Sequence, residues 1–328
     1  MKKIAIFVDG GNKLGMGNFS RVLPVALYLR QNNLAEVSFV VVDKLLEQKL
    51  KPIGFEVLKY EGKSVTELKD EISNLKNKGF DKVLIDVRND YNVSNLVKHI
   101  KKHITCPVIA IGVQDDSRLL MDCVIYPLPK KLIEELYWNK YEGKVLASIK
   151  FLPVRQEFFD IKPTKKIDKI VVSMGGSDPH DIVMKVMKYL SDGGYKIKII
   201  IGPGFANKDK VDAFAAQHKD VFRIISSPKN IAREVADASL VITASGISVY
   251  EFSILKKPLI VIGHYPLNSV NCRKLEKLGY CRYLGLFNEF SKDDLVEAVQ
   301  NPPKFVLKKS ELPDERGAQR IAEAVLDE

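Results

Sequence analysis

The chain has 328 residues, of which 46% are hydrophobic and 28% are charged, a composition typical of a globular protein with room for two cores. Its formal net charge is +10, from 51 Lys and Arg against 41 Asp and Glu, which suits an anionic ligand, a nucleic acid or an acidic membrane surface. No basic block with interleaved aromatic residues occurs, and this argues against a nucleic-acid partner.

The sequence carries no pattern of export, membrane insertion or zinc binding. It opens on a strand-like segment without a long apolar core or a cleavage site, and no later apolar run is long enough to cross a bilayer. We therefore expect a cytoplasmic protein. Four cysteines lie far apart without C-x-x-C spacing, which predicts buried free thiols; they are Cys106, Cys123, Cys272 and Cys281.

The first predicted unit is a strand, a glycine-rich loop and a helix. Residues 4–8 are an apolar run typical of a buried parallel strand, and residues 19–30 have helical character. The glycines of the loop between them are Gly10, Gly11, Gly15 and Gly17. Such loops hold phosphorylated ligands in many α/β proteins, but this spacing matches neither the dinucleotide-binding pattern nor the P-loop. Taken alone, the loop fits a tight structural turn as well as a substrate cradle.

Three more strands are predicted in the N-terminal half. They cover residues 37–42, 82–87 and 108–112, with helical patterns at residues 66–78 and 93–103 between them. An aspartate lies at or soon after the end of three strands: Asp9, Asp86 and Asp115. Aspartate favours strand-terminal turns and helix caps, which is the simplest role for any one of them. Because the carboxyl ends of parallel strands share one edge of a sheet, the three together predict a pocket wall.

The middle of the chain has the features of a linker. Periodicity weakens across residues 126–163, where prolines recur, and strand and helix patterns restart at residue 169. The second half then repeats the layout of strand, double glycine and helix. We predict an N-terminal domain at residues 1–150, a linker at 151–165, a C-terminal domain at 166–312 and a terminal helix at 313–328.

Small and hydroxylic residues follow three strands of the second half, at residues 169–174, 197–201 and 239–243. These residues are Gly175, Gly176 and Ser177, then Gly202 and Gly204, then Ser245, Gly246 and Ser248, with the apolar Ile247 between the last two. The last run opens a helix, whose first amide groups are free to bind an anion. Glu251 lies one to two turns further along that helix, and His264 follows the last strong strand, at residues 258–263.

The order of the motifs resembles that of one enzyme family. The markers are D-G-G-x-K-x-G-M-G at the start, R-Q-E-F at 155–158, M-G-G-S-D-P at 174–179, A-S-G-I-S-V-Y-E at 244–251 and R-G-A-Q-R-I-A at 316–322. Across nearly the whole chain they resemble the metal-independent hydrolases of sialic-acid-like sugar biosynthesis, including the related spore-coat polysaccharide proteins. These hydrolases remove UDP from UDP-2,4-diacetamido-2,4,6-trideoxy-sugars. The family is similar to the GT-B glycosyltransferases, including the enzyme that adds N-acetylglucosamine to lipid intermediates of cell-wall synthesis.

The resemblance implies an α/β protein of the GT-B fold: two Rossmann-like, doubly wound parallel-sheet domains with the sugar nucleotide in the cleft between them. The C-terminal domain would hold UDP, with uracil near residues 202–204 and 226–231, the diphosphate at 245–248 and the ribose at Glu251. The last helix would fold back over the N-terminal domain. The expected substrate-binding positions are Gly10, Gly11, Gly15, Gly17, Arg21, Gly175, Gly176, Ser177, Gly202, Gly204, Ile231, Ser245, Gly246, Ile247, Ser248, Glu251, His264 and Asn268.

One residue departs from the resembled family. In the hydrolases the G-x-G of the first loop is followed by a histidine proposed to activate the attacking water, and here that place is Asn18. An amide has no basic lone pair near neutral pH, so Asn18 can orient a water or a sugar hydroxyl but cannot take its proton. The mechanism implied by the resemblance therefore cannot apply unchanged.

Several residues are candidates for the missing base and for substrate contact. In addition to Asn18, the candidate catalytic residues are three possible bases: Asp9, Asp86 and Asp115. For each of them a structural role is the simpler alternative. Arg21 fits a sugar or phosphate contact and an exposed helix arginine equally well. A lone histidine such as His180 or His264 more often caps a turn or touches substrate than abstracts a proton. Arg155 and Glu157, in the linker, are expected to form an ion pair that fixes domain orientation.

Three functions remain open on these residues. The first is hydrolysis of a UDP-sugar in surface polysaccharide or nonulosonic acid biosynthesis, with another group replacing the histidine. The second is transfer of the sugar to a hydroxyl of a sugar or lipid acceptor, for which the basic charge would favour peripheral contact with an anionic membrane. The third is non-catalytic binding of a UDP-sugar. No cofactor is expected, and no metal, since no Asp-x-Asp pair is poised for a divalent ion.

Overall fold

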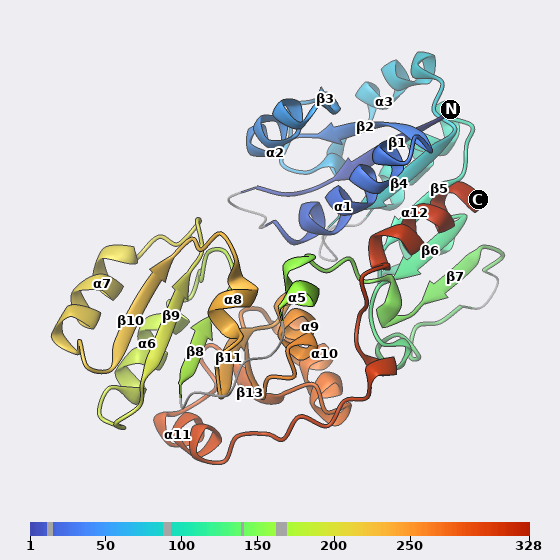
Figure 1. Ribbon diagram of the computed structural model, residues 1–328. Coiled ribbons are helices and arrows are strands. Elements are labelled where there is room, and N and C mark those ends of the chain that lie inside the picture. Colours follow the sequence, from blue (N-terminus) through green and yellow to red (C-terminus); the bar gives the residue numbers. More distant parts are fainter. Residues whose placement is uncertain (12–15, 88–92, 139–140, 162–168) are drawn as a thin grey trace. The chain divides into compact units, whose positions relative to one another are not determined.

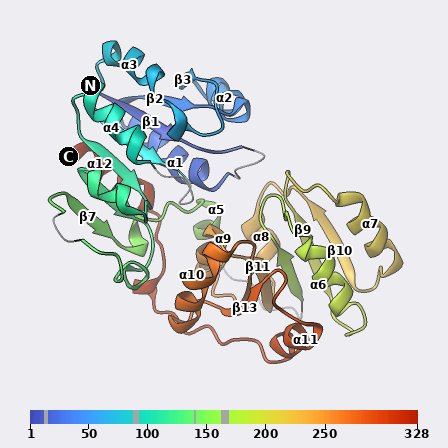
Figure 2. The ribbon, with the colours of Figure 1, turned by 180° about the vertical axis from the view of Figure 1, so that it is seen from behind.

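The chain folds into two compact α/β units. The computed structural model describes residues 1–11, 16–87, 93–138, 141–161 and 169–328 (Figure 1). One unit comprises Met1–Pro153 and Asp314–Glu328, and the other comprises Val154–Pro313. Each is a twisted parallel sheet with helices packed against it (Figures 1 and 2). The prediction of two Rossmann-like parallel-sheet domains is confirmed.

The first unit has seven parallel strands in the order β3-β2-β1-β4-β5-β6-β7. Their bounds are β1 Lys2–Val8, β2 Ala35–Val41, β3 Glu56–Lys59, β4 Lys82–Asp86, β5 Val108–Ile111, β6 Cys123–Tyr126 and β7 Lys144–Ala147. The α-helices are α1 Gly17–Gln31, α2 Lys44–Leu50, α3 Asp70–Leu75, α4 Ser94–His103 and α12 Gly317–Asp327. Strand order reverses direction between β1 and β4, and in open parallel sheets ligands bind at the carboxyl edge beside such a reversal.

Two apolar clusters cover the two faces of this sheet. On one face α1 and α12 pack together (Figure 1). Val25 and Leu29 of α1 and Ile321 and Val325 of α12 are fully buried there. On the other face lie α3 and α4. The C-terminal helix thus belongs to the core of the N-terminal unit, and its apolar period of three and four residues explains why it packs there.

The second unit has six parallel strands in the order β10-β9-β8-β11-β12-β13. Their bounds are β8 Ile170–Ser173, β9 Ile197–Ile201, β10 Phe222–Ser226, β11 Leu240–Ala244, β12 Leu259–Gly263 and β13 Arg282–Leu286. The α-helices are α5 Glu157–Asp160, α6 Ile182–Leu190, α7 Lys208–Gln217, α8 Ile231–Val235, α9 Ile247–Ile254, α10 Pro266–Lys277 and α11 Lys292–Gln300. The reversal of strand order lies between β8 and β11, so the loops after these two strands lie at its carboxyl edge.

Two details of the predicted secondary structure are wrong. The helix predicted at residues 66–78 is broken into a 3₁₀ turn at Val65–Glu67, the short α3 and a second 3₁₀ turn at Lys76–Lys78. Leu68 between them is extended and buried, so the chain leaves a helical path to place this side chain in the core. The weakly periodic stretch at residues 126–163 is not linker throughout, because β7 lies within it and extends the first sheet.

The described part of the chain was compared with the predictions for membrane segments, metal ligands and cysteines. No helix there is long and apolar enough to cross a membrane. No group of three or more His, Cys, Asp or Glu side chains among the described residues is placed to hold a metal ion. All four cysteines are free; Cys106 is half-buried and the other three are buried, as predicted for free thiols.

Candidate functional site

The carboxylate of Asp86 lies at the centre of the polar groups at the carboxyl edge of the first sheet. Asp86 ends β4, is fully buried and accepts three hydrogen bonds. Nε and Nη2 of Arg21 donate to its two oxygens at 2.7 and 2.5 Å, and Nδ2 of Asn18 donates to Oδ1 at 2.9 Å. Asn18 and Arg21 lie one turn apart on α1, which brings both side chains to the same carboxylate.

This contact fixes the orientation of the Asn18 amide. Both oxygens of an ionised Asp86 can only accept hydrogen bonds, so the NH₂ group of Asn18 must face it, and Oδ1 of Asn18 is left to accept a bond from another group. Burial raises the pKa of the Asp86 carboxyl, and the guanidinium of Arg21 opposes that rise. The arrangement orients the Asn18 amide and supplies no proton acceptor at this position.

Asp9 lies beside Asp86, at the end of the neighbouring strand. Its backbone N–H donates to the carbonyl of Asp86, and its carboxylate accepts from Oγ of Ser64 at 2.7 Å and from the N–H of Val65 at 3.0 Å. Asp9 is 2% exposed. The carboxylate therefore ties the loop that begins at Ser64 to the end of β1, which is a structural role.

Asp115 has a capping role. Its Oδ1 accepts a hydrogen bond from the N–H of Ser117 at 2.8 Å and another from the Ser117 hydroxyl, and Asp115 is the N-cap of the 3₁₀ turn Asp116–Leu120. The structure thus brings Asp9 and Asp86 together at one sheet edge. The carboxylate of Asp115 is directed to its own turn.

The glycine-rich loop shows at Gly11 why glycine is needed. Gly11 has φ of +138°, and a Cβ there would lie 2.0 Å from Oδ2 of Asp43, the N-cap of α2. A side chain at this position would force the loop away from α2. Gly10 is buried beside Leu46, and Gly17 begins α1. Gly15 lies outside the described residues.

In the second unit, two glycine loops touch backbone to backbone. The N–H of Gly204, after β9, donates to the carbonyl of Gly176, after β8, at 2.8 Å. A Cβ on Gly202 would lie 2.6 Å from the backbone of Gly175 and Gly176. Ser177 follows and is half-buried. These five predicted substrate positions therefore form one continuous surface of backbone at the carboxyl edge of this sheet.

The start of α9 has no side-chain cap. Gly246 precedes the helix, and no side chain accepts from its first amide groups within the described part of the chain. Ser245, Ile247 and Ser248 around it are all half-buried. An uncapped helix start has amide groups and a helix dipole that favour an anion, as predicted for this position.

Glu251, further along α9, is 4% exposed and is held by Arg155. Nε and Nη2 of Arg155 donate to the two carboxylate oxygens, each at 2.9 Å. Arg155 also contacts Oε1 of Glu157 at 3.2 Å, and the same oxygen accepts from the N–H of Ile231 at 3.2 Å. One chain of polar contacts thus joins Glu251 to Ile231, the predicted ribose and uracil positions.

Arg155 has one partner that the sequence predicted and one that it did not. The expected pair with Glu157 is present, and both partners belong to the second unit. The stronger, two-pronged contact is with Glu251, 96 residues away. The R-x-E spacing at residues 155–157 was the available signal, but it gave no indication of the third partner.

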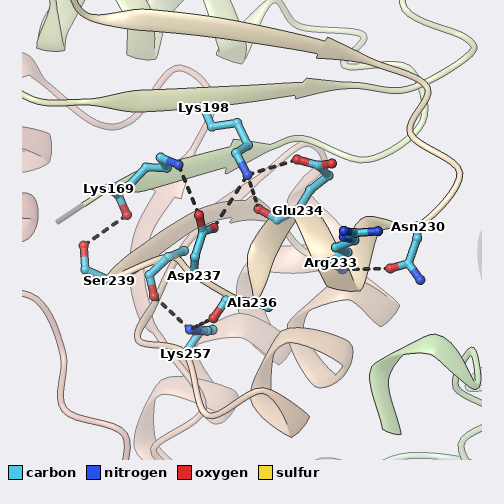
Figure 3. Close-up of polar contacts among 10 residues, drawn as sticks. Lys169, Lys198, Asn230, Arg233, Glu234, Ala236, Asp237, Ser239 and Lys257 are labelled. Carbon is cyan, nitrogen blue, oxygen red and sulfur yellow. Dashed lines mark hydrogen bonds and ion pairs between the residues drawn. The ribbon is translucent and has the colours of Figure 1, made fainter. Parts of the chain in front are cut away.

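Three lysines hold the C-terminal end of α8, the helix that begins at Ile231 (Figure 3). Nζ of Lys257 donates to the carbonyls of Ala236 and Ala238, at 2.5 and 2.9 Å. Nζ of Lys198 donates to the carbonyl and carboxylate of Glu234, and Lys169 pairs with Asp237 at 3.1 Å. Cations at the carbonyl end of a helix satisfy groups that would otherwise be left without a donor.

Lys257→Met should therefore lower the stability of the second unit. Lys257 is 2% exposed, and its loss leaves two buried carbonyls without this donor. We expect a loss of about 2 to 4 kcal/mol in the free energy of unfolding, measured by calorimetry or denaturant titration. Lys219→Met, at an exposed lysine of the same unit, is the matched control and should change it by about 0.5 kcal/mol or less. Equal stability of the two variants would contradict this role for Lys257.

His264 follows β12, and its ring reaches across the edge of the sheet. Nε2 lies 3.3 Å from the carbonyl of Met174, at the end of β8, and the residue is 9% exposed. Burial lowers the pKa of His264, and the contact with Met174 opposes that shift. The ring is thus neutral at neutral pH, with Nε2–H donating to Met174. The side chain of Asn268, also a predicted substrate position, lies outside the described residues.

Comparison with known proteins identifies the fold. The family model of the glycosyltransferase family 28 C-terminal domain matches residues 170–325. The crystal structure of MurG from Acinetobacter baumannii superposes over 100% of both chains, with a TM-score of 0.69 and 13% identity. UDP-GlcNAc 2-epimerase from Neisseria meningitidis bound to UDP-GlcNAc superposes over 100% of both chains, with a TM-score of 0.63 and 13% identity. The chain has the GT-B fold.

Two curated proteins are related in sequence. The uncharacterized protein MJ1062 of Methanocaldococcus jannaschii is 27% identical over 275 residues, 79% of this chain and 55% of that protein, so the chain spans about half the length of this relative. The spore coat polysaccharide biosynthesis protein SpsG of Bacillus subtilis is 22% identical over 346 residues, 99% of this chain and 98% of SpsG. The spore-coat part of the resemblance is supported by this match, while hydrolase activity stays a prediction.

Proposed function

We propose that the protein binds a UDP-sugar of the acetamido class and transfers the sugar to a hydroxyl acceptor, without a metal ion. The observation that carries the proposal is the contact of Asn18 with Asp86, which presents an amide oxygen where a water-activating base is expected. The GT-B fold, the family 28 match and the similarity to SpsG favour a nucleotide-sugar enzyme that acts in polysaccharide biosynthesis.

The departing UDP needs stabilisation of negative charge on its β-phosphate. The uncapped start of α9 can supply amide donors, and the glycine loops after β8 and β9 let a ligand approach the backbone closely. Glu251 suits the ribose because a carboxylate can accept from both hydroxyls of a diol. Donors of this kind can neutralise the leaving group without a metal ion.

The polar groups expected to contact the incoming nucleophile favour a sugar hydroxyl over water. Asn18 cannot accept a proton, Asp86 already accepts from three donors, and Asp9 accepts from Ser64 and Val65. A sugar hydroxyl bound by Oδ1 of Asn18 gains orientation and exclusion of water, which contribute to transfer even without a strong base. Hydrolysis remains the second candidate because of the five markers shared with the hydrolases.

Titration calorimetry with UDP tests the nucleotide site. We expect the wild type to bind UDP and Glu251→Gln to bind it at least about tenfold more weakly, because the substitution removes a charge-assisted acceptor for the ribose hydroxyls. Glu297→Gln is the matched control, since the Glu297 carboxylate contacts Arg282 and Asn301 at the exposed surface of the same unit. Absence of UDP binding to the wild type, or equal affinity in all three proteins, would contradict the assignment.

A further inference from the structure

Two histidine rings meet at the carboxyl edge of the second sheet. The ring centroids of His180 and His264 are 5.9 Å apart. His180 also stacks on Phe287 at 3.9 Å with an interplanar angle of 6°, and Tyr265 lies against both histidines. The aromatic contacts hold the two imidazoles in fixed positions.

Each ring has a buried nitrogen without a hydrogen bond in the described part of the chain. These atoms are Nε2 of His180 and Nδ1 of His264. Nε2 of His264 is used by Met174, so Nδ1 of the neutral ring carries a lone pair and no proton. Buried polar atoms nearly always have a hydrogen-bond partner. Two unpaired nitrogens on rings whose centroids are 5.9 Å apart therefore need an explanation.

The pair lies next to the expected diphosphate position. His264 follows β12, whose Ile262 is the partner of Ala244 in β11, and Ser245 and Gly246 come directly after Ala244. His180 lies in the loop that begins with Gly175 and Gly176 after β8. The histidines therefore lie at the ends of the strands on both sides of β11, which leads into the uncapped start of α9.

We propose that His180 and His264 are the proton-coupled part of the diphosphate subsite, so that a UDP-sugar binds together with a proton from solvent. The inference depends on the proposed function, because it takes the anion to be the diphosphate of that ligand. In the free protein Nδ1 of His264 is a lone pair without a donor, and Nε2 of His180 has no partner among the described residues. Negative charge bound at the start of α9 favours the imidazolium form of the pair, and protonation provides the missing donor.

The other charged groups around the pair are already committed to protein partners. Asp178 accepts from the N–H groups of Ile182 and Val183 at the start of α6. Asp181 accepts from Asn207, and Nζ of Lys185 donates to the carbonyls of Phe287 and Phe290. Tyr265 is the remaining titratable neighbour. The ring nitrogens Nε2 of His180 and Nδ1 of His264 are thus the buried polar atoms of this cluster that have no partner among the described residues.

The sign of the pH dependence follows from the pKa of His264. Burial lowers this pKa in the free protein, and a bound anion raises it. The affinity for a UDP-sugar should therefore rise as the pH falls through the histidine range. If close to half a proton is taken up on average, affinity at pH 6 is roughly tenfold higher than at pH 8.

The test is titration of the whole protein with UDP-N-acetylglucosamine in buffers of different ionisation enthalpy at pH 7. This ligand is suitable because each of its phosphates is bonded through one ester and one anhydride oxygen and does not titrate near neutral pH, unlike the terminal phosphate of UDP. The dependence of the binding heat on the buffer gives the number of protons taken up. We expect about 0.5 or more per ligand bound.

Variants assign the proton to the pair. His180→Gln and His264→Gln should each reduce the uptake, and the double variant should reduce it to near zero, whereas His218→Gln should not change it. His218 is the matched control because it stacks on Phe214 in α7 and contacts the carbonyl of that residue. Binding of the ligand to the wild type without proton uptake overturns this inference alone, as does uptake that persists in the double variant. Absence of binding to the wild type overturns the proposed function as well.

Discussion

Asp86→Asn is expected to lower the free energy of unfolding of the N-terminal unit by about 3 kcal/mol and to reduce UDP-sugar turnover by roughly 100-fold. The substitution leaves the guanidinium of Arg21 beside a neutral amide, in a place where the carboxylate is fully buried. It also removes the acceptor that orients Asn18. Denaturant titration measures the first effect, and the rate of UDP release with acceptor present measures the second.

The control for this variant is Glu61→Gln in the same unit. Glu61 is 94% exposed in its pair with Lys59, so its replacement should change stability by less than about 0.5 kcal/mol. If Asp86→Asn is as stable as this control, the three-donor contact does not hold the sheet edge together. If it loses stability but keeps full activity, Asp86 does not act through Asn18.

Asn18→His should increase UDP release into water by about 100-fold or more. An imidazole at this position can donate one ring N–H to Oδ1 of Asp86, as the amide does, which leaves the second nitrogen free to take a proton from water. The carboxylate would orient the ring and select its tautomer. The measurement is UDP release from a UDP-acetamido sugar without acceptor, at pH values where the ring is neutral.

Asn18→His both adds a base and removes the amide, and Asn18→Ala distinguishes these two effects. It removes the amide without supplying a proton acceptor, so water-dependent release should stay at the wild-type level. Binding of UDP should be unchanged in both variants, because the nucleotide is expected in the other unit. Unchanged release by Asn18→His, with UDP still bound, would contradict a role for residue 18 in binding the nucleophile.

The interior strands could be predicted from the sequence because they are continuous apolar runs. Residues 82–86 and 197–201 are buried at every position, lysines included, as expected of strands covered on both faces. Edge strands gave a weaker signal. In β7 Lys144 and Val145 are exposed, and every residue of β13 is half-buried, so neither has the pattern of an interior strand.

The positions of the candidate site followed from topology, whereas its contacts did not. Parallel strands put Asp9 and Asp86 at one edge, as expected. The pairing of Asp86 with Arg21 depends on how α1 packs over the sheet, which no local pattern encodes. The contact between Arg155 and Glu251 likewise spans 96 residues. Unpaired nitrogens such as Nδ1 of His264 become visible only once the surrounding atoms are placed.

Release of UDP from UDP-N-acetylglucosamine and related UDP-acetamido sugars, first in water and then with a hydroxyl acceptor added, distinguishes transfer from hydrolysis most directly. We expect the wild type to bind the nucleotide, to release UDP in water no faster than Asn18→Ala does, and to release it rapidly once an acceptor is present. Rapid release by the wild type in water alone, well above that of Asn18→Ala, would contradict transfer and establish hydrolysis.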